Sequence, residues 1–230
     1  MHNQLDILFE DNHLIAVNKA VSDIIQRDKT EDDSLEDKIK IFIAQRDKKP
    51  GKVFLGIAHR LDRPVTGVVI FAKTSKALVR MNEMFKKKEV RKIYWAIVKE
   101  KPPAVSGDLE HHLFRNQKMN KSFIRAKPGE DTKLASLSYK IIGKSDNYYL
   151  LEVELHTGRH HQIRAQLAHL GCPVKGDLKY GFPRSNKNGG ISLHARSIRF
   201  IHPVRKQEIY IEAPAPQDDI FNVFETKPLK

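Results

Sequence analysis

The chain has 230 residues, a length that allows one large domain or two small ones, each with a substantial core. Its 41 lysines and arginines outnumber its 28 aspartates and glutamates, and the formal net charge of +13 predicts a polyanionic partner, either nucleic acid or an anionic membrane surface. No apolar run approaches the ~20 residues that span a bilayer, residues 1–10 lack the pattern of a signal peptide, and the single cysteine excludes an internal disulfide. We therefore expect a cytoplasmic protein that binds nucleic acid and no membrane.

Two capped helices and several strands are predicted in the first ninety residues. Ser34, with Asp37 three residues later, indicates the start of a helix that runs to about residue 45. Thr74 or Ser75 caps a second helix, which ends in lysines at 86–88; those lysines are either a solvated helix end or a phosphate-contacting patch. Strands are predicted at residues 6–10, 14–18, 53–57 and 68–72.

The rest of the chain predicts mainly strands. Residues 99–132 are polar and rich in loop-forming residues, so no regular element is predicted there. Apolar residues at helical spacing predict a helix over about 163–170, which Gly171 ends. Residues 214–230 are expected to form a tail with marginal order. Further strands are predicted at residues 91–98, 134–142, 148–155, 191–201 and 208–212.

Many strands, few helices and no regular βαβ alternation predict an α+β fold around a mixed, largely antiparallel central sheet flanked by helices and loops. The sequence contains no Gly/Ser linker, no internal repeat and no low-complexity tract. We therefore expect a single domain over residues 1–230, with its core at about 5–213.

One stretch, residues 59–67, stands out because an acid lies between two arginines just before a buried strand. Asp62 is flanked by Arg60 and Arg63, and the turn that follows contains Pro64 and Gly67. Nearby guanidinium groups favour the ionised form of a carboxylate. From these residues alone, a salt-bridged loop and a catalytic carboxylate are both open interpretations.

The sequence resembles the RluA family of RNA pseudouridine synthases, whose motifs occur here in the family's order over roughly residues 5–213. Each fragment alone is weak, whereas the fragments in order, with strands and a helix in the family's places, are specific. The matching segments are His59-Arg60-Leu61-Asp62; Thr66-Gly67 with Phe71-Ala72-Lys73; Lys92, Tyr94, Ala96 and Val98; Thr157-Gly158-Arg159 with His161-Gln162-Ile163-Arg164; Gly176-Asp177 with Tyr180-Gly181; and Leu193-His194-Ala195 with His202-Pro203.

The resemblance implies an enzyme with the pseudouridine synthase fold that isomerises specific uridines to pseudouridine in structured RNA, either tRNA or rRNA, without a metal or a cofactor. It implies that Asp62 is the catalytic carboxylate, which attacks C1′ or C6 of the target nucleotide. Arg164 would pair with Asp62, and the Tyr94 hydroxyl would help to remove the C5 proton. The residues implied to contact the substrate are Arg60, Arg159, Ile163 and Leu193.

The chain departs from the family pattern at three places. Residues 19–23 read Lys-Ala-Val-Ser-Asp where the family usually has Lys-Pro-x-Gly, Val65-Thr66 replaces Thr-Ser, and His160 replaces a threonine. The first strand is predicted within the first ten residues, so we expect no N-terminal S4 RNA-binding domain. We also expect a monomer, and the sequence implies no protein partner.

Three other interpretations remain for these residues. A catalytically silent RNA-binding or ribosome-assembly protein on the same fold would explain the charge alone. A nucleoside hydrolase or glycosidase would need a second carboxylate beside Asp62, for which Asp108 and Asp177 are the candidates. The histidines near the predicted third helix suggest zinc, although no ligand spacing matches a known type. Those histidines are His156, His160, His161 and His169.

Overall fold

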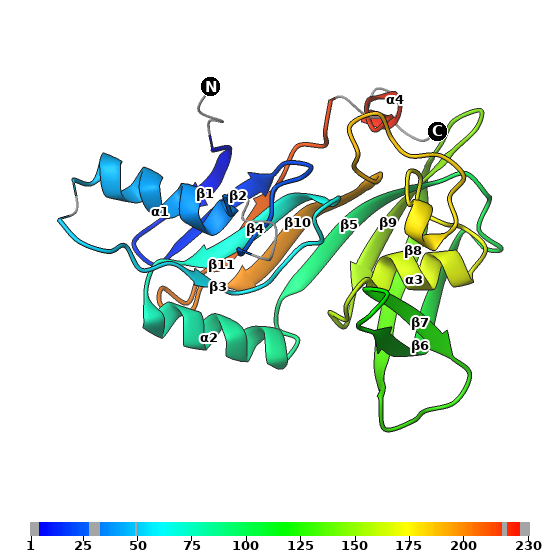
Figure 1. Ribbon diagram of the computed structural model, residues 1–230, viewed down its shortest axis with the longest axis horizontal. Helices are drawn as coiled ribbons and strands as arrows, with labels where there is room; N and C mark the ends of the chain where they lie inside the picture. Colours follow the sequence, from blue (N-terminus) through cyan, green and yellow to red (C-terminus); the bar gives the residue numbers. More distant parts are fainter. Residues whose placement is uncertain (1–4, 28–32, 49, 218–219, 226–230) are drawn as a thin grey trace. The chain divides into compact units, whose positions relative to one another are not determined.

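A computed structural model describes residues 5–27, 33–48, 50–217 and 220–225, and the chain divides into two units (Figure 1). The first unit comprises Met1–Val90 and Ser197–Pro214, and the second comprises Arg91–Arg196 and Ala215–Lys230. The predicted α+β class with a largely antiparallel sheet is confirmed. The prediction of one domain over residues 1–230 stays a prediction.

The sheet of the first unit is built around β4, which is buried along its whole length. The hydrogen-bonded order is β1-β2-β4-β10, with β3 on β4 and β11 on β10. β2 and β4 run antiparallel, from the Leu14–Ala72 pair to the Lys19–Gly67 pair. The strands are β1 (Ile7–Glu10), β2 (Leu14–Lys19), β3 (Gly56–Ile57), β4 (Thr66–Ala72), β10 (Leu193–Ile201, of which residues from Ser197 belong here) and β11 (Glu208–Glu212).

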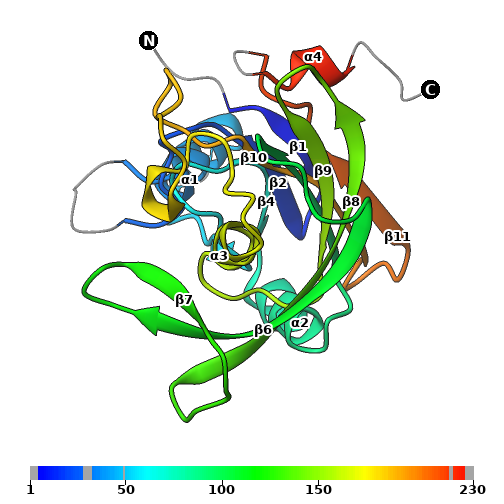
Figure 2. The ribbon, with the colours of Figure 1, turned by 90° about the vertical axis from the view of Figure 1, so that its right-hand side faces the viewer.

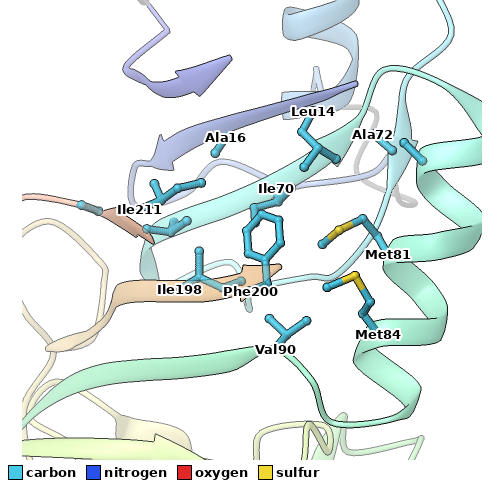
Figure 3. Packing of buried hydrophobic residues seen from close by; sticks show 13 residues of the cluster. Leu14, Ala16, Ile70, Ala72, Met81, Met84, Val90, Ile198, Phe200 and Ile211 are labelled. Carbon is cyan, nitrogen blue, oxygen red and sulfur yellow. The ribbon is translucent and has the colours of Figure 1, made fainter. Parts of the chain in front are cut away.

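Alternate residues of β2 and β4 pack into two separate cores, one on each face of this sheet, because successive side chains of a strand point to opposite faces. Leu14 and Ile70 belong to the cluster that includes Met81 of α2 (Figure 3). Ile15 and Phe71 belong to the other cluster, which α1 covers. With both faces covered, β4 is a continuous apolar run, which is why its sequence predicts a strand so clearly.

Both helices of the first unit begin where their caps predict. The Ser34 Oγ accepts from the backbone N–H of Asp37 at 3.2 Å, and the Thr74 Oγ1 accepts from that of Ala77 at 3.2 Å. The helices are α1 (Leu35–Arg46) and α2 (Ser75–Lys86).

The second unit is an antiparallel sheet in the order β5-β9-β8-β6-β7, with α3 on one of its faces (Figure 2). The expectation that 99–132 has no regular element is wrong, because this segment contains β6 and β7. Their sequence is polar because one face is open to solvent, and their pairing with β8 is a long-range feature. The elements are β5 (Arg91–Val98), β6 (Ser106–Asn116), β7 (Lys121–Arg125), β8 (Thr132–Lys144), β9 (Tyr149–Leu155), α3 (Gln162–His169) and a 3₁₀ turn (Leu178–Tyr180).

The C-terminal segment is packed rather than marginally ordered over its described part, residues 214–217 and 220–225. Phe221 and Phe224 lie in a core cluster with Ile97 and Leu150, and α4 spans Asn222–Glu225. A Cβ added at Gly143 would lie 2.7 Å from the Phe224 ring, so the tail depends on a glycine there. The expectation of a marginally ordered tail is therefore wrong for these residues; residues 218–219 and 226–230 lie outside the described part.

We expect Phe221→Ala to lower the free energy of unfolding by about 3–5 kcal/mol, because the ring is 1% exposed and its removal leaves a cavity. Val223→Ala is the matched control: its side chain is 43% exposed, and the change should stay within about 0.5 kcal/mol. Urea unfolding of both variants measures the difference. Equal effects would contradict the packing of the tail on the second unit.

Within the residues that the structure describes, no helix is long and apolar enough to cross a membrane.

Candidate active site

Asp62 lies in the first unit, on the loop that joins β3 to β4. The backbone N–H of Val65 donates to the Asp62 carbonyl at 3.0 Å and closes a turn over Arg63 and Pro64. The Asp62 side chain is half-buried, whereas Arg60 and Arg63 are exposed. The loop therefore presents one partly shielded carboxylate between two arginines that face solvent.

Lys19, the last residue of β2, fixes the far side of this loop. Its side chain is 1% exposed, and its Nζ donates to the carbonyls of Ala20 at 2.9 Å, Arg63 at 2.9 Å and Val65 at 2.7 Å. The backbone N–H of Ser22 donates to the same Arg63 carbonyl at 3.3 Å. The backbone on both sides of Pro64 is thus held by one buried ammonium group.

The departure from the Lys-Pro-x-Gly motif leaves this anchor in place. Ser22 occupies the motif's glycine position with φ +71°, in the left-handed region that glycine adopts without strain. For a residue with a Cβ, that conformation costs roughly 1–2 kcal/mol. Ser22 therefore adopts, at some expense in backbone energy, a conformation that a glycine at this position would adopt without strain.

Burial lowers the pKa of Lys19 from its ordinary 10.5 to about 8, although the carboxylates of Asp23 and Asp62 act in the opposite direction. Asp62 thus lies within electrostatic range of a buried ammonium group. Sequence reasoning did not single out Lys19. The available signal was a lysine that directly follows the apolar strand and opens the partly matched motif.

The stability of the protein should rise with pH between about 8 and 10.5 on account of Lys19. In that window the unfolded chain binds the Lys19 proton more tightly than the folded chain does, since the folded pKa is about 8. The full change is about 3 kcal/mol at 1.36 kcal/mol per pH unit. Urea unfolding should show the full rise in wild type and in Lys76→Met, whose lysine is exposed. In Lys19→Met the rise should be smaller, and the part that remains comes from Lys92, whose pKa is also lowered by burial. An identical pH dependence of all three proteins would contradict it.

His59 fixes the near side of the loop. Its Nε2 accepts from the backbone N–H of Ile70 on β4 at 3.1 Å, and its ring centroid lies 5.1 Å from that of Phe85 on α2. The histidine of the His-Arg-Leu-Asp motif is therefore a structural anchor. The segment that carries Asp62 is held at both ends by side chains of the first unit.

The other predicted site residues lie in the second unit. Tyr94 is on β5 opposite Val153 and is 8% exposed. Ile163, on α3, is buried, and so is Leu193, the first residue of β10. Arg159 is exposed and donates through Nε to the carbonyl of Leu134 at 2.9 Å.

Arg164 forms a buried, two-pronged ion pair with Asp177. The Nε to Oδ2 distance is 2.7 Å and the Nη2 to Oδ1 distance is 2.9 Å, with side-chain exposures of 6% and 1%. The guanidinium carbon lies 5.1 Å from the centre of the Tyr180 ring. Arg164 is thus a buried group held in one orientation by Asp177. Sequence reasoning named Asp177 within a segment that matches the family and as a candidate second acid, but not as the partner of Arg164. Its signal was the Gly-Asp motif.

A polar network fixes the start of α3, which opens at His161 with φ +53°. The His161 Nδ1 is 3.1 Å from the Tyr180 hydroxyl, which donates to the carbonyl of Ser122 on β7 at 3.2 Å. Burial, aided by the neighbouring Arg164 charge, lowers the pKa of His161 to about 2, so the imidazole is neutral. His160 stacks on His161 with ring centroids 3.8 Å apart. In the described part of the chain, no group of three or more His, Cys, Asp or Glu is placed to hold a metal ion.

The seven predicted site residues therefore fall on two units: Arg60 and Asp62 on the first, and Tyr94, Arg159, Ile163, Arg164 and Leu193 on the second. In the structure, Arg164 forms an ion pair with Asp177. The predicted pairing of Arg164 with Asp62, and the role of each residue, stay predictions.

Comparison with known proteins gives consistent matches. Residues 13–169 match the model of a family described as RNA pseudouridylate synthase. The chain is 31% identical over 218 residues to an uncharacterized RNA pseudouridine synthase of Bacillus subtilis, covering 94% of this chain and 70% of that protein. It is 33% identical over 245 residues to tRNA pseudouridine synthase C of Haemophilus ducreyi, covering 96% of each.

A solved structure of a protein with a related name has a similar fold. The structure of human RNA pseudouridylate synthase domain containing 4 superposes with a TM-score of 0.78, at 22% identity, covering 92% of this chain and 89% of that chain. The predicted pseudouridine synthase fold is therefore confirmed.

Proposed function

Because this chain belongs to the RNA pseudouridylate synthase family, we propose that it isomerises specific uridines of structured RNA to pseudouridine, with Asp62 as the catalytic carboxylate. The prediction of an RNA pseudouridine synthase is confirmed at the level of the family. Names of relatives include a tRNA pseudouridine synthase and ribosomal large subunit pseudouridine synthases. We place the substrate among tRNA and rRNA on that basis.

The reaction moves the attachment of the base from N1 to C5 without any net oxidation or reduction. The N1–C1′ bond breaks, a C5–C1′ bond forms, and the C5 hydrogen leaves as a proton that is replaced at N1. A carboxylate suits this chemistry, because it can add to C1′ or to C6 and later leave as the same carboxylate. The proposed mechanism accordingly uses no metal and no cofactor.

The anchored loop is the observation that carries the assignment of Asp62. A nucleophile must be held within a narrow range of positions relative to its target. Here Lys19 holds two carbonyls that follow Asp62 in sequence, and His59 holds the segment that precedes it. The carboxylate is half-buried, so it is shielded yet accessible to a nucleotide.

The second unit supplies the other roles, except that of Arg60, which lies on the first unit. In the proposal, the buried Tyr94 hydroxyl helps to take the C5 proton, and Arg164, held by Asp177, pairs with Asp62. Leu193 and Ile163 would offer apolar contact to the base. The exposed arginines Arg60 and Arg159 would contact the RNA backbone.

The physiological setting is part of the same proposal. Uridine in folded RNA is stacked, so the target must be turned out of its helix or loop at a cost of a few kcal/mol, which phosphate contacts offset. We propose a cytoplasmic, monomeric enzyme whose catalytic domain covers residues 1–230 and which needs no protein partner.

The test uses the C5 hydrogen as the reporter. Purified protein is incubated with tRNA and rRNA transcripts that carry tritium at C5 of uridine, and tritium in water is counted. Release of tritium with no free uracil supports the isomerase, whereas free uracil would indicate a hydrolase. Pseudouridine mapping of RNA from cells with and without the gene then names the site. RNA binding with neither tritium release nor a changed site would overturn the proposal in favour of an RNA-binding protein.

A further inference from the structure

The three strands β8, β6 and β7 present two faces of different character. Leu113, Ile124 and Ala135 belong to the cluster that also includes Ala165 of α3, so their face is the covered one. Since successive side chains alternate across a strand, Phe114 and its cross-strand partners point to the opposite face.

Two phenylalanines form a cross-strand pair on this second face. Phe114 and Phe123 lie directly opposite each other in the β6–β7 register, and both rings are half-buried. Next to them, Leu134 is 41% exposed and lies opposite His112. The pair is thus an apolar surface that this unit leaves partly open.

A cation lies against each ring. The Arg125 guanidinium carbon is 4.8 Å from the centre of the Phe114 ring. The Lys121 Nζ is 5.3 Å from the centre of the Phe123 ring and 4.8 Å from that of the Tyr180 ring. In the part of the chain that the structure describes, neither cation forms an ion pair with a carboxylate. We call the set formed by Phe114, Phe123, Lys121 and Arg125 the aromatic face.

The surrounding sequence has one sign of charge. From residue 112 to residue 127 there is no aspartate or glutamate, and the five lysines and arginines are Arg115, Lys118, Lys121, Arg125 and Lys127. The chain also contains a similar pair with the opposite surroundings, in which Arg199 lies 5.2 Å from the Tyr210 ring. There Arg199 pairs with Glu208, and the Tyr210 hydroxyl donates to Glu212. Of these two, the aromatic face is the one whose rings lie beside cations that form no ion pair in the described part of the chain.

We propose that the aromatic face binds an unpaired segment of the RNA substrate outside the active site, by stacking bases on Phe114 and Phe123 while Lys121 and Arg125 contact phosphates. Stacking on aromatic or guanidinium planes and phosphate contact by cations are how single-stranded RNA is held. The inference rests on the proposed function for the identity of the RNA. It assigns these residues to substrate affinity and none of them to the chemical step.

Binding of an oligouridylate of about ten nucleotides, measured by fluorescence anisotropy, tests the proposal. Phe114→Leu/Phe123→Leu should weaken binding at least about 30-fold, because stacking is worth roughly 1–3 kcal/mol per base and the variant removes two rings. Phe114→Tyr/Phe123→Tyr should restore it. Lys121→Gln/Arg125→Gln should reduce the salt slope of the binding constant by roughly 0.7 for each phosphate that the variant no longer neutralises. Tyr210→Leu is the matched control, and it should bind like wild type.

Cross-linking keeps the test decisive if the leucine variant folds poorly. RNA that contains 5-iodouracil should cross-link to Phe114 or Phe123 in the wild-type protein. The proposal is overturned if neither phenylalanine is cross-linked, if the leucine variant binds like wild type, or if Tyr210→Leu weakens binding equally. Tritium release by wild type is followed in parallel, so that failure of the isomerase assignment is distinguished from failure of the aromatic face.

Discussion

Asp62→Asn should reduce tritium release from uridine-labelled RNA at least about a thousandfold, as expected for loss of an essential nucleophile. The amide has nearly the shape of the carboxylate but lacks its charge and its nucleophilic oxygen. Because the loop is held through the backbone carbonyls of Arg63 and Val65, the substitution leaves those anchors intact. The melting temperature should therefore change by less than about 2 °C, equivalent to under 1 kcal/mol.

Asp23→Asn is the matched control for Asp62→Asn. Asp23 is the other carboxylate that acts on Lys19, and its Oδ1 lies 2.7 Å from the Lys38 Nζ. If the role of Asp62 were only to balance the Lys19 charge, both variants would lose activity alike. We expect Asp23→Asn to keep turnover within a few-fold of wild type. Substantial pseudouridine formation by Asp62→Asn would show that the Asp62 carboxylate is not the nucleophile.

Arg164→Met should lower the free energy of unfolding by about 3–5 kcal/mol. The substitution leaves the Asp177 carboxylate, which is 1% exposed, without its guanidinium partner, and an uncompensated buried charge is strongly destabilising. Arg164→Lys should recover part of the stability but not the two-pronged geometry, since a lysine cannot form the fork. Urea unfolding of wild type and both variants measures these differences.

The same unit contains an exposed counterpart for comparison. Arg91 binds Glu154 through two hydrogen bonds of 2.8 Å, with the arginine side chain 53% exposed. Arg91→Met should cost less than about 1 kcal/mol, because exposed ion pairs contribute little. If Arg91→Met and Arg164→Met were equally destabilising, burial of the Arg164–Asp177 pair would not be the reason for its strength.

For catalytic activity, we expect Asp177→Asn to lower kcat more than it raises KM, since the substitution would loosen Arg164 without removing it.

Short sequence patterns correctly predicted those helices and strands that depend on a few neighbouring residues. The caps Ser34 and Thr74 and the apolar run of β4 each depend on a few neighbouring residues, and the structure places them as expected. The strands β6 and β7 were missed because their alternation is polar on one side and their partner β8 is distant in sequence. The packed tail was missed for the same reason, since the partners of Phe221 lie on β5 and β9.

The residues of the candidate site also differ in whether a local pattern or a distant contact explains them. The motif around Asp62 was visible because its acid, turn and strand are contiguous. Lys19 and Asp177 act through contacts that span 44 and 13 residues of sequence, and no local pattern marks a lysine as buried or an aspartate as paired. Sequence reasoning therefore found the residues proposed to react, and His59 and Asp177 as parts of motifs, but it missed Lys19 and the contacts through which these residues hold the site.

The first unit is built from two separate segments of the chain, and this limits when its core can fold during synthesis. The core on the α2 side of the first unit contains Leu14, Ile70 and Met81, but it also needs Ile198, Phe200 and Ile211 (Figure 3). A ribosome translates from the N-terminus, so this core stays open until nearly the whole chain has emerged. The second unit is also incomplete until then, because Phe221 and Phe224 lie in its core with Ile97 and Leu150. A nascent chain that stalls before residue 197 would thus expose an apolar surface, and released fragments of that length are expected to aggregate.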